Sequence, residues 1–273
     1  MRDFSYTASD GERIDLSCES LWTGAAVGTR GHEWGYSMSS RSMSGIMRKA
    51  REVDIPVATD DRRLMDAARR AFDRDLDAKK PGLFRSDGWE MRGYVVAFSP
   101  SVIDGDRVAG TFKAVFTDGA WTRLEGESVP VPSTADGADL DYPHDYPHDF
   151  APQKRTSRIR RRPGGVPADV RLVVYGPASN PSVSVAGNVY SVRCSVPAGG
   201  YLVVDGRDKT VELVAANGDR SSRFADAERG SGRGSGRYVF ERVPCGDLPL
   251  DWDGTFAFDF LWYEEEGEPP WSR

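Results

Sequence analysis

Cysteine and long apolar runs are both scarce in this chain of 273 residues. The three cysteines, Cys18, Cys194 and Cys245, are an odd and sparse set. They argue against a disulfide framework and fit reduced thiols in a reducing compartment. No run approaches the roughly 20 apolar residues of a membrane helix, and the first residues lack the apolar core of a signal peptide. We therefore expect no membrane insertion and no disulfide-built fold.

The sequence also lacks an excess of basic residues and any of the common catalytic motifs. The formal net charge is −6, so no global positive field indicates nucleic-acid binding. The sequence contains no nucleophile elbow, no phosphate-binding loop, no cysteine pairs at zinc spacing and no His-Glu-x-x-His motif. We therefore predict a protein that is not an enzyme and holds no cofactor.

The composition that is present favours a turn-rich β protein. Hydrophobic residues are 39% and aromatic residues 11%, enough for real cores, and the chain has 29 glycines and 17 prolines. Turn dipeptides such as Asp10-Gly11, Asp104-Gly105 and Gly187-Asn188 separate short alternating segments. The sequence therefore predicts a mainly β, two-domain fold.

One helix is predicted, at about residues 60–79. Thr59 or Asp60 is expected to cap it, and Pro81-Gly82 to end it. Its buried face, at spacings of three and four, is expected to comprise Leu64, Ala68, Ala71, Phe72 and Leu76.

Strands are expected on either side of this helix. Val53, Ile55 and Val57 alternate with polar residues, and Pro56 among them indicates an edge strand. After the helix, residues 89–98, 108–116 and 121–124 are predicted to form a meander.

Residues 141–150 repeat Asp-Tyr-Pro-His and then close with Asp149 and Phe150. Two prolines four apart exclude a regular helix and an inner strand. We interpret the segment as a stiff connector between domains, and possible assembly contact, carried by Tyr142, Pro143, Tyr146, Pro147 and Phe150.

The same connector carries His144 and His148 among aspartates, which are suitable ligands for a transition metal. Imidazoles four residues apart share one side only in a helix, which the prolines prevent. A polar connector with solvated histidines is the alternative, and we predict no metal site.

The expected domains are 1–150, a basic linker at 151–165, and 166–273. The basic run at 154–162 has two interpretations besides a solvated linker: contact with nucleic-acid phosphate or pairing with an acidic neighbouring subunit. The second domain is predicted to be a β-sandwich of evenly spaced short strands, with residues 238–243 and 255–263 as its last two strands. Residues 229–236, rich in Gly, Ser and Arg, predict a mobile loop tip.

Two further patterns suggest contact with sugars. Exposed tryptophans such as Trp252 or Trp271 would form a platform for a glycan or a partner, although tryptophans in strands are mostly core residues. Three glutamates at 264–266 could supply carboxylates for glycoside hydrolysis, but adjacent residues are not expected to straddle a sugar.

Several of these features together resemble the distal tail protein (Dit) family of long-tailed phages and prophages of Gram-positive bacteria. They are the Tyr-Pro-x-Asp-Tyr-Pro-x-Asp-aromatic connector, Val173-Val-Tyr-Gly-Pro177 followed by Asn180-Pro181, and the final Pro270-Trp271. The resemblance covers nearly the whole chain. The two histidines depart from the more aromatic connector expected in that family.

The resemblance implies an N-terminal β-sandwich with one helix that forms a ring, usually a hexamer, and an outward C-terminal sandwich of galectin-like or carbohydrate-module-like type. The ring would join the tail tube protein to the tail-associated lysin or fibre, with receptor-binding proteins on the outer domains and DNA passing through the lumen. The protein would be made in the host cytoplasm and located at the distal tail tip of the virion. The alternatives are a carbohydrate-binding module that recognises host cell-wall glycans, and a wall-degrading enzyme.

Overall fold

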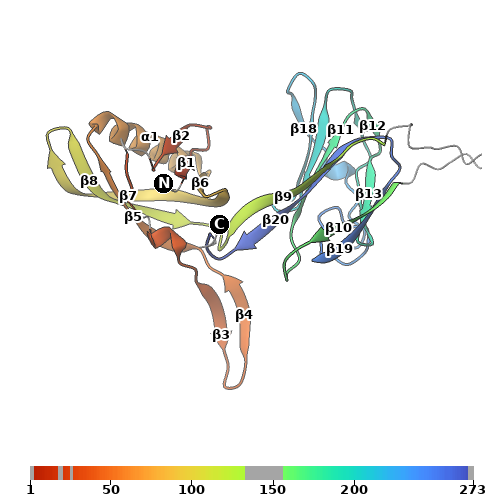
Figure 1. Cartoon of the computed structure of the whole chain (residues 1–273), viewed down its shortest axis with the longest axis horizontal. Coiled ribbons are helices and arrows are strands. Elements are labelled where there is room, and N and C mark those ends of the chain that lie inside the picture. The colour runs from red at the N-terminus through yellow and green to blue at the C-terminus, as the bar shows by residue number, and fades with distance from the viewer. Residues whose placement is uncertain (1–2, 18–20, 25–26, 133–155, 270–273) are drawn as a thin grey trace, which may run out of the picture. The chain divides into compact units, whose positions relative to one another are not determined.

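The computed structural model describes residues 3–17, 21–24, 27–132 and 156–269, and this part of the chain is mainly β with one α-helix. The chain divides into two compact units (Figure 1). Unit 1 comprises Met1–Arg123 and Glu265–Arg273, and unit 2 comprises Leu124–Glu264. These limits differ from the predicted domains 1–150 and 166–273. They fall inside two strands, β9 (Trp121–Val129) and β20 (Phe258–Glu266), each of which begins in one unit and ends in the other.

Unit 1 is built on an antiparallel sheet in the order β2-β1-β6-β7-β8-β5. The predicted first hairpin is confirmed, since β1 pairs with β2. The strand around Pro56 pairs with β8 on one side, which agrees with the predicted edge position, although an isolated bridge joins Ala58 to Trp22. The strands are β1 (Phe4–Thr7), β2 (Arg13–Asp15), β5 (Arg51–Thr59), β6 (Gly82–Ser86), β7 (Trp89–Asp104), β8 (Arg107–Phe116) and β9 (Trp121–Val129).

The predicted meander is wrong in its last step. Strand β9 meets β7, at Glu90 and Thr122, and not β8. The reason is that β8 already has a partner on each side, because β5 takes the free edge that β9 would need.

The helix α1 (Arg62–Ala78) confirms the predicted helix and corrects its details. Asp61 is the N-cap, and its carboxylate accepts a hydrogen bond from the Arg63 N–H at 2.8 Å. Leu64 and Leu76, expected in the core, are partly exposed. The buried face keeps Ala68, Ala71 and Phe72, with Met65 and Asp75 in place of Leu64 and Leu76.

A buried polar pair explains why Asp75 was not expected in the core. Asp75 is 1% exposed, and its carboxylate accepts hydrogen bonds from the Tyr6 hydroxyl and from the Ser9 N–H. The Tyr6 ring contacts Phe72 and Phe84 edge-on. An acidic residue is counted as polar in a hydrophobic pattern, so the pattern could not place Asp75 in the core.

Unit 2 is a β-sandwich, as predicted. One sheet has the order β18-β17-β16-β11-β20 and the other β10-β19-β13-β14. Rings from the two sheets meet in the core: Tyr190 lies 6.1 Å from Phe260, and Trp252 lies 5.3 Å from Phe258, between ring centroids. The strands are β10 (Thr156–Arg162), β11 (Val170–Tyr175), β12 (Ala178–Ser179), β13 (Ser182–Val185), β14 (Asn188–Ser191), β15 (Ser195–Val196), β16 (Tyr201–Asp205), β17 (Thr210–Val214), β18 (Arg220–Ser222), β19 (Gly246–Trp252) and β20 (Phe258–Glu266).

The basic run predicted as a linker is a strand in most of its length. Strand β10 pairs with β19 along seven residues, from Thr156 opposite Trp252 to Arg162 opposite Gly246. The Arg162 guanidinium is almost fully buried, donates to the Val166 carbonyl at 2.7 Å and lies 3.5 Å from the Glu264 carboxylate. Because Val166 and Glu264 compensate the buried charge of Arg162, this basic segment can form part of the sandwich.

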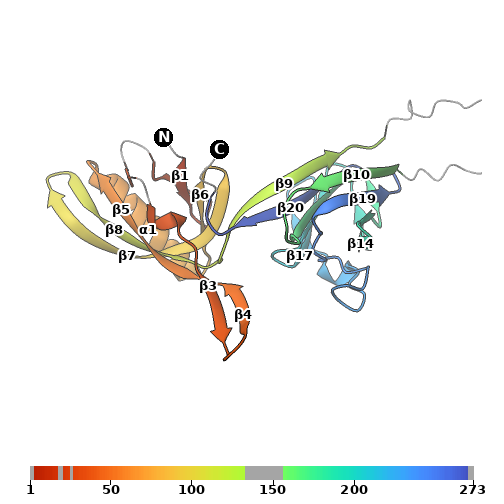
Figure 2. The ribbon, with the colours of Figure 1, turned by 60° about the horizontal axis from the view of Figure 1, so that its bottom comes forward.

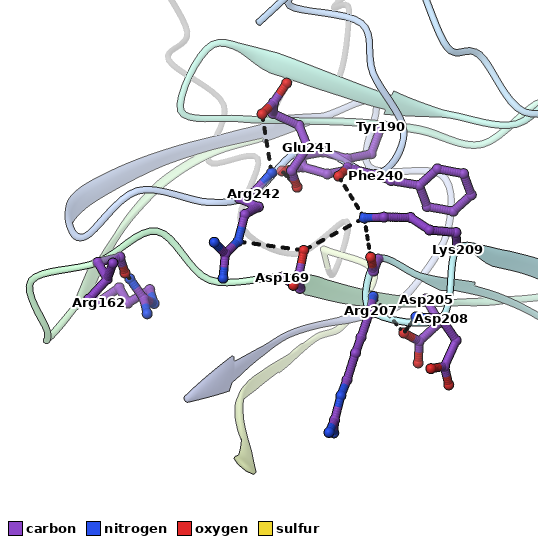
Figure 3. A network of polar contacts seen from close by, with 12 residues as sticks. Arg162, Asp169, Tyr190, Asp205, Arg207, Asp208, Lys209, Phe240, Glu241 and Arg242 are labelled. Carbon is purple, nitrogen blue, oxygen red and sulfur yellow. Dashed lines mark hydrogen bonds and ion pairs between the residues drawn. The ribbon is translucent and has the colours of Figure 1, made fainter. Parts of the chain in front are cut away.

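The strand predicted at 238–243 is not formed, because side chains satisfy the backbone groups that a neighbouring strand would have paired. Asn188 bonds both the N–H and the carbonyl of Tyr238. The Tyr190 hydroxyl donates to the Glu241 carbonyl at 3.1 Å, and the Lys209 ammonium donates to the Phe240 carbonyl at 3.5 Å (Figure 3). The segment forms one isolated β-bridge, in which Val243 pairs with Ala168.

Burial of phenol groups predicts how stability changes in alkali. Burial, and then the Asp75 carboxylate, raises the pKa of Tyr6 far above its ordinary value, and burial likewise raises the pKa of Tyr190 and of Tyr263. The unfolded chain releases these protons from about pH 10, whereas the folded chain holds them. The free energy of unfolding is therefore expected to be unaffected by these groups below pH 10 and to fall as the pH rises above it.

Urea denaturation at several pH values between 8 and 11 would measure this fall. The control is the variant with Tyr190→Phe and Tyr263→Phe, whose stability should decline less steeply with pH. Equal slopes for the two proteins would contradict the assignment.

Candidate functional site

A hairpin made of β3 (Trp34–Met38) and β4 (Met43–Arg48) is the most exposed apolar part of unit 1. The two strands pair only with each other and form a separate two-stranded sheet. Figures 1 and 2 both show it projecting from the rest of its unit. A two-stranded hairpin alone is marginally stable in water, so this one gains from a surface that covers it.

Three methionines lie on the hairpin, and we call them the hairpin methionines. Met38 is directly opposite Met43 on one face of the hairpin. The register shift places Met47 opposite Gly35 on the other face, because Gly35 is three residues from Met38 along β3. All three are more than half exposed, and Met38 reaches 75%. The chain has six methionines, so half of them are gathered on this hairpin. Methionine side chains adapt to irregular surfaces, which suits a contact with another protein.

The face of Met38 and Met43 also carries Trp34, which is four residues from Met38 on the same strand. The Arg48 guanidinium lies 5.0 Å from the centroid of the Trp34 ring, directly across the strand pair. Ile46 is more than half exposed. Tyr36 sits at the register shift between Gly35 and Ser37 and is also more than half exposed. Both faces of the hairpin therefore offer apolar surface.

The base of the hairpin is held by the short 3-10 helix η1 (Val27–Arg30). The buried Arg30 guanidinium donates to the Pro269 carbonyl at 2.9 Å and to the Asp87 carboxylate at 3.3 Å. The Thr29 carbonyl accepts from the Arg51 guanidinium at 2.7 Å and from the Trp121 indole at 3.3 Å. These contacts join η1, which precedes the hairpin in the chain, to β5, to β9 and to the carboxy-terminal segment.

The carboxy-terminal segment also reaches this base. His32 Nδ1 lies 3.8 Å from a carboxylate oxygen of Glu268, and a side chain at Gly267 would collide with the His32 ring. Burial lowers the pKa of the Arg51 guanidinium, and the negative charge of Glu268 opposes this. The end of the chain thus adds negative charge where three basic side chains gather.

The predicted site residues fall elsewhere or outside the described residues. Tyr142, Pro143, Tyr146, Pro147 and Phe150 lie outside them, as do His144, His148 and Trp271. Trp252 is only 3% exposed and packs against Phe258, so its ring is not available as a platform for sugar. Within the described residues no group of three His, Cys, Asp or Glu side chains is placed to hold a metal ion, and no helix is long and apolar enough to cross a membrane.

One of the three glutamates at 264–266 already has partners within its own unit. Glu264 accepts a hydrogen bond from the Trp262 indole at 2.8 Å and pairs with Arg162. Its role in the structure is to neutralise a buried guanidinium.

The hairpin itself was missed by sequence reasoning. Its signal was present in the alternation of Met43, Gly45 and Met47 beyond a polar turn at 39–42. Alternation of this kind predicts a half-buried strand, and nothing in it distinguishes burial within one chain from burial against a partner.

Comparison with known proteins places this fold among phage tail proteins. No protein-family model and no curated protein matches the sequence. The solved structure of the SPP1 Dit protein (gp 19.1), described as a hub of the adsorption apparatus in phages that infect Gram-positive bacteria, has a TM-score of 0.56 at 12% identity. The alignment covers 97% of this chain and 99% of that one.

Chains of the phage P2 baseplate in its activated conformation give similar results. The structure with Ca has a TM-score of 0.58 and the structure with Sr 0.59, each at 9% identity and covering 98% of this chain and 100% of the other. The resemblance noted in the sequence is therefore confirmed in the structure: over nearly its whole length this chain has the fold of the phage distal tail and baseplate hub proteins.

Proposed function

We propose that this protein is a structural hub at the distal end of a long, non-contractile phage tail, where six copies of the chain form a closed ring. The fold shared with a phage hub protein supports the hub role. The single observation that carries the ring is the β3–β4 hairpin, whose two faces expose large apolar side chains that unit 1 leaves uncovered. Contiguous apolar surface of this kind marks a protein contact.

The shape of the hairpin favours a ring over a symmetric pair. A closed ring requires a surface on each copy to meet a different surface on the next, with a rotation that closes. A projecting finger and the surface that receives it are two different surfaces. The edge of β5 near Val57 and the connector at 142–150 are further proposed contacts.

The proposed partners follow from the position of a hub. The ring joins the tail tube protein on one side to the tail-associated lysin or fibre on the other, and unit 2 carries receptor-binding proteins. The protein is made in the host bacterial cytoplasm and resides at the distal tip of the tail in the virion. Its role is assembly and not catalysis.

The charge of the chain suits a channel for DNA. A net charge of −6 repeated around a ring supports a lumen that repels phosphate, so that DNA passes without binding. A ring structure whose lumen is lined mainly by Lys and Arg would contradict this.

The carbohydrate-binding alternative finds less support. It relied on exposed tryptophans in the second unit, whereas Trp252 and Trp262 are both buried. The enzyme alternative needed two facing carboxylates, and the candidate Glu264 is occupied by Arg162.

The mass of the full chain in solution tests the ring. Light scattering over a range of concentrations is expected to give about six times 30.1 kDa, the mass of one chain. If the chain is monomeric at every concentration, both alone and mixed with the tail tube protein, the ring is excluded.

A further inference from the structure

Residues 229–237 of unit 2 form a loop with an internal repeat, which we call the RGSG loop. It reads Arg-Gly-Ser-Gly twice and closes on a third arginine, so Arg229, Arg233 and Arg237 recur every four residues. The four glycines between them all have positive φ angles, from 48° to 106°. Residues other than glycine rarely adopt this conformation, so the repeat sets the backbone as well as the charges.

The RGSG loop was expected to be a mobile tip, and the structure shows contacts along its length. The Gly232 N–H donates to the Arg229 carbonyl at 2.9 Å, and the Ser235 N–H donates to the Gly232 carbonyl at 3.2 Å. At its end the Gly236 carbonyl accepts from the Val189 N–H at 2.9 Å. The loop is therefore held in successive turns and attached to β14.

The backbone of the RGSG loop already binds one anionic group. The Gly234 N–H donates to a carboxylate oxygen of Glu241 at 2.6 Å. Backbone N–H groups that follow alternating right- and left-handed residues form concave sites for anions. The Glu241 carboxylate, which belongs to the same chain, accepts the hydrogen bond of the Gly234 N–H that an external anion could otherwise accept.

Positive charge gathers around this backbone. Arg233 has no acidic partner among the residues that the structure describes. Arg237 has one, because its guanidinium lies 3.0 Å from the Glu228 carboxylate. Arg233 also interacts electrostatically with the Lys209 ammonium. That ammonium is held by the Gly206 and Phe240 carbonyls and by Asp169 (Figure 3). Burial lowers the pKa of Lys209; Asp169 opposes the shift, and Arg233 lowers the pKa further. Repulsion between like charges is thus built into this region of an acidic protein.

The two partly exposed rings next to the loop in the described structure already have partners. Phe224 has the Arg229 guanidinium 4.7 Å from its ring centroid and stacks on Phe240 at 5.9 Å. Tyr238 meets Phe240 edge-on at 5.8 Å. Proteins that bind single-stranded nucleic acid combine a basic groove with exposed rings. The charge here therefore fits a flexible polyanion that has no bases.

We propose that the RGSG loop binds a flexible polymer with phosphate groups repeated along its backbone, such as a polyol phosphate. Evenly spaced guanidinium groups pair with successive phosphates, and each planar guanidinium can donate two parallel hydrogen bonds to phosphate oxygens. The Gly234 N–H becomes a further donor to phosphate when the Glu241 carboxylate moves away from it. This inference is independent of the ring, because all the residues involved belong to unit 2.

The test uses the full chain and a poly(glycerol phosphate) oligomer, with affinity measured by calorimetry at 50 and 200 mM salt. Replacing Arg229, Arg233 and Arg237 with serine is expected to weaken binding at least about tenfold at low salt and to flatten its salt dependence. The matched control removes three exposed arginines from the helix of unit 1, as Arg63→Ser, Arg69→Ser and Arg70→Ser, and should keep the affinity.

A second variant has the opposite expected sign. Glu241→Gln removes the internal anion beside Gly234 and should tighten binding severalfold. Unchanged affinity in the triple loop variant, or equal loss in the unit 1 control, would overturn the proposal. Tighter binding of a single-stranded DNA oligomer or of dextran sulfate than of poly(glycerol phosphate) would overturn the choice of ligand.

Discussion

Replacing Met38, Met43 and Met47 with serine is expected to convert the ring into folded monomers. The three side chains are the hairpin methionines, and burying each against a neighbour contributes about 1.5–3 kcal/mol. Their combined loss, about 5 kcal/mol for each contact, corresponds to an affinity more than about 1,000-fold weaker. Light scattering would measure the loss of the large species. The hairpin side chains are exposed in the single chain, so its thermal unfolding should change little.

A control with the same chemistry lies in unit 2. Val131, Ile159 and Val166 are also exposed aliphatic residues, at 49%, 70% and 67%. Changing these three to serine is expected to leave the ring intact. Rings of unchanged mass in the methionine variant would show that the hairpin is not a contact between copies.

Replacing Asp75 with alanine is expected to destabilise unit 1 by about 3 kcal/mol. The substitution leaves the buried Tyr6 hydroxyl without its acceptor and also removes the acceptor of the Ser9 N–H. Urea denaturation followed by fluorescence would measure the change; if the two units unfold in separate transitions, only that of unit 1 should shift.

The partner substitution completes the comparison. Tyr6→Phe alone leaves the buried carboxylate with one donor fewer, whereas Tyr6→Phe combined with Asp75→Ala removes both groups. The double variant should therefore lose less stability than the sum of the two single ones. Asp73→Ala, at an exposed position of the same helix, is the control and should change stability by less than about 0.5 kcal/mol. Additive losses would show that the pair does not act as a unit.

Local chemistry in the sequence was enough to predict the class of fold. The capped helix at 62–78, the edge strand with Pro56, and the short strands between Gly and Asn turns all follow from rules that act within a few residues. Phenylalanines 256, 258 and 260 alternate with other residues along the predicted last strand, and all three are buried. Each of these features depends on neighbours in the sequence.

The parts that could not be predicted depend on partners far along the chain. Arg162 reads as a linker residue until Val166 and Glu264 are known to surround it. The segment at 238–243 reads as a strand until Asn188, Tyr190 and Lys209 are known to bond its backbone. Asp75 reads as a surface residue of a helix until Tyr6 is placed against it.

The candidate site was unpredictable for a related reason. The hairpin is apolar on both faces, and the sequence does not show that its own unit leaves these side chains exposed. Trp252 was misjudged in the opposite direction, since a tryptophan beside a polar turn can as easily point into a core. Both errors concern the exposure of side chains, which the local sequence pattern does not determine.

The division of the chain into units has a consequence for recombination. Unit 2 is an insertion within unit 1, entered through β9 and left through β20, and residues 265–269 return to contact Arg30 and His32. A gene exchange that replaces unit 2 cleanly therefore needs two crossovers, near codons 124 and 264. A stop codon anywhere in unit 2 would also remove the Pro269 carbonyl from the base of the hairpin, so a truncation in the second half of the gene damages the first half of the protein.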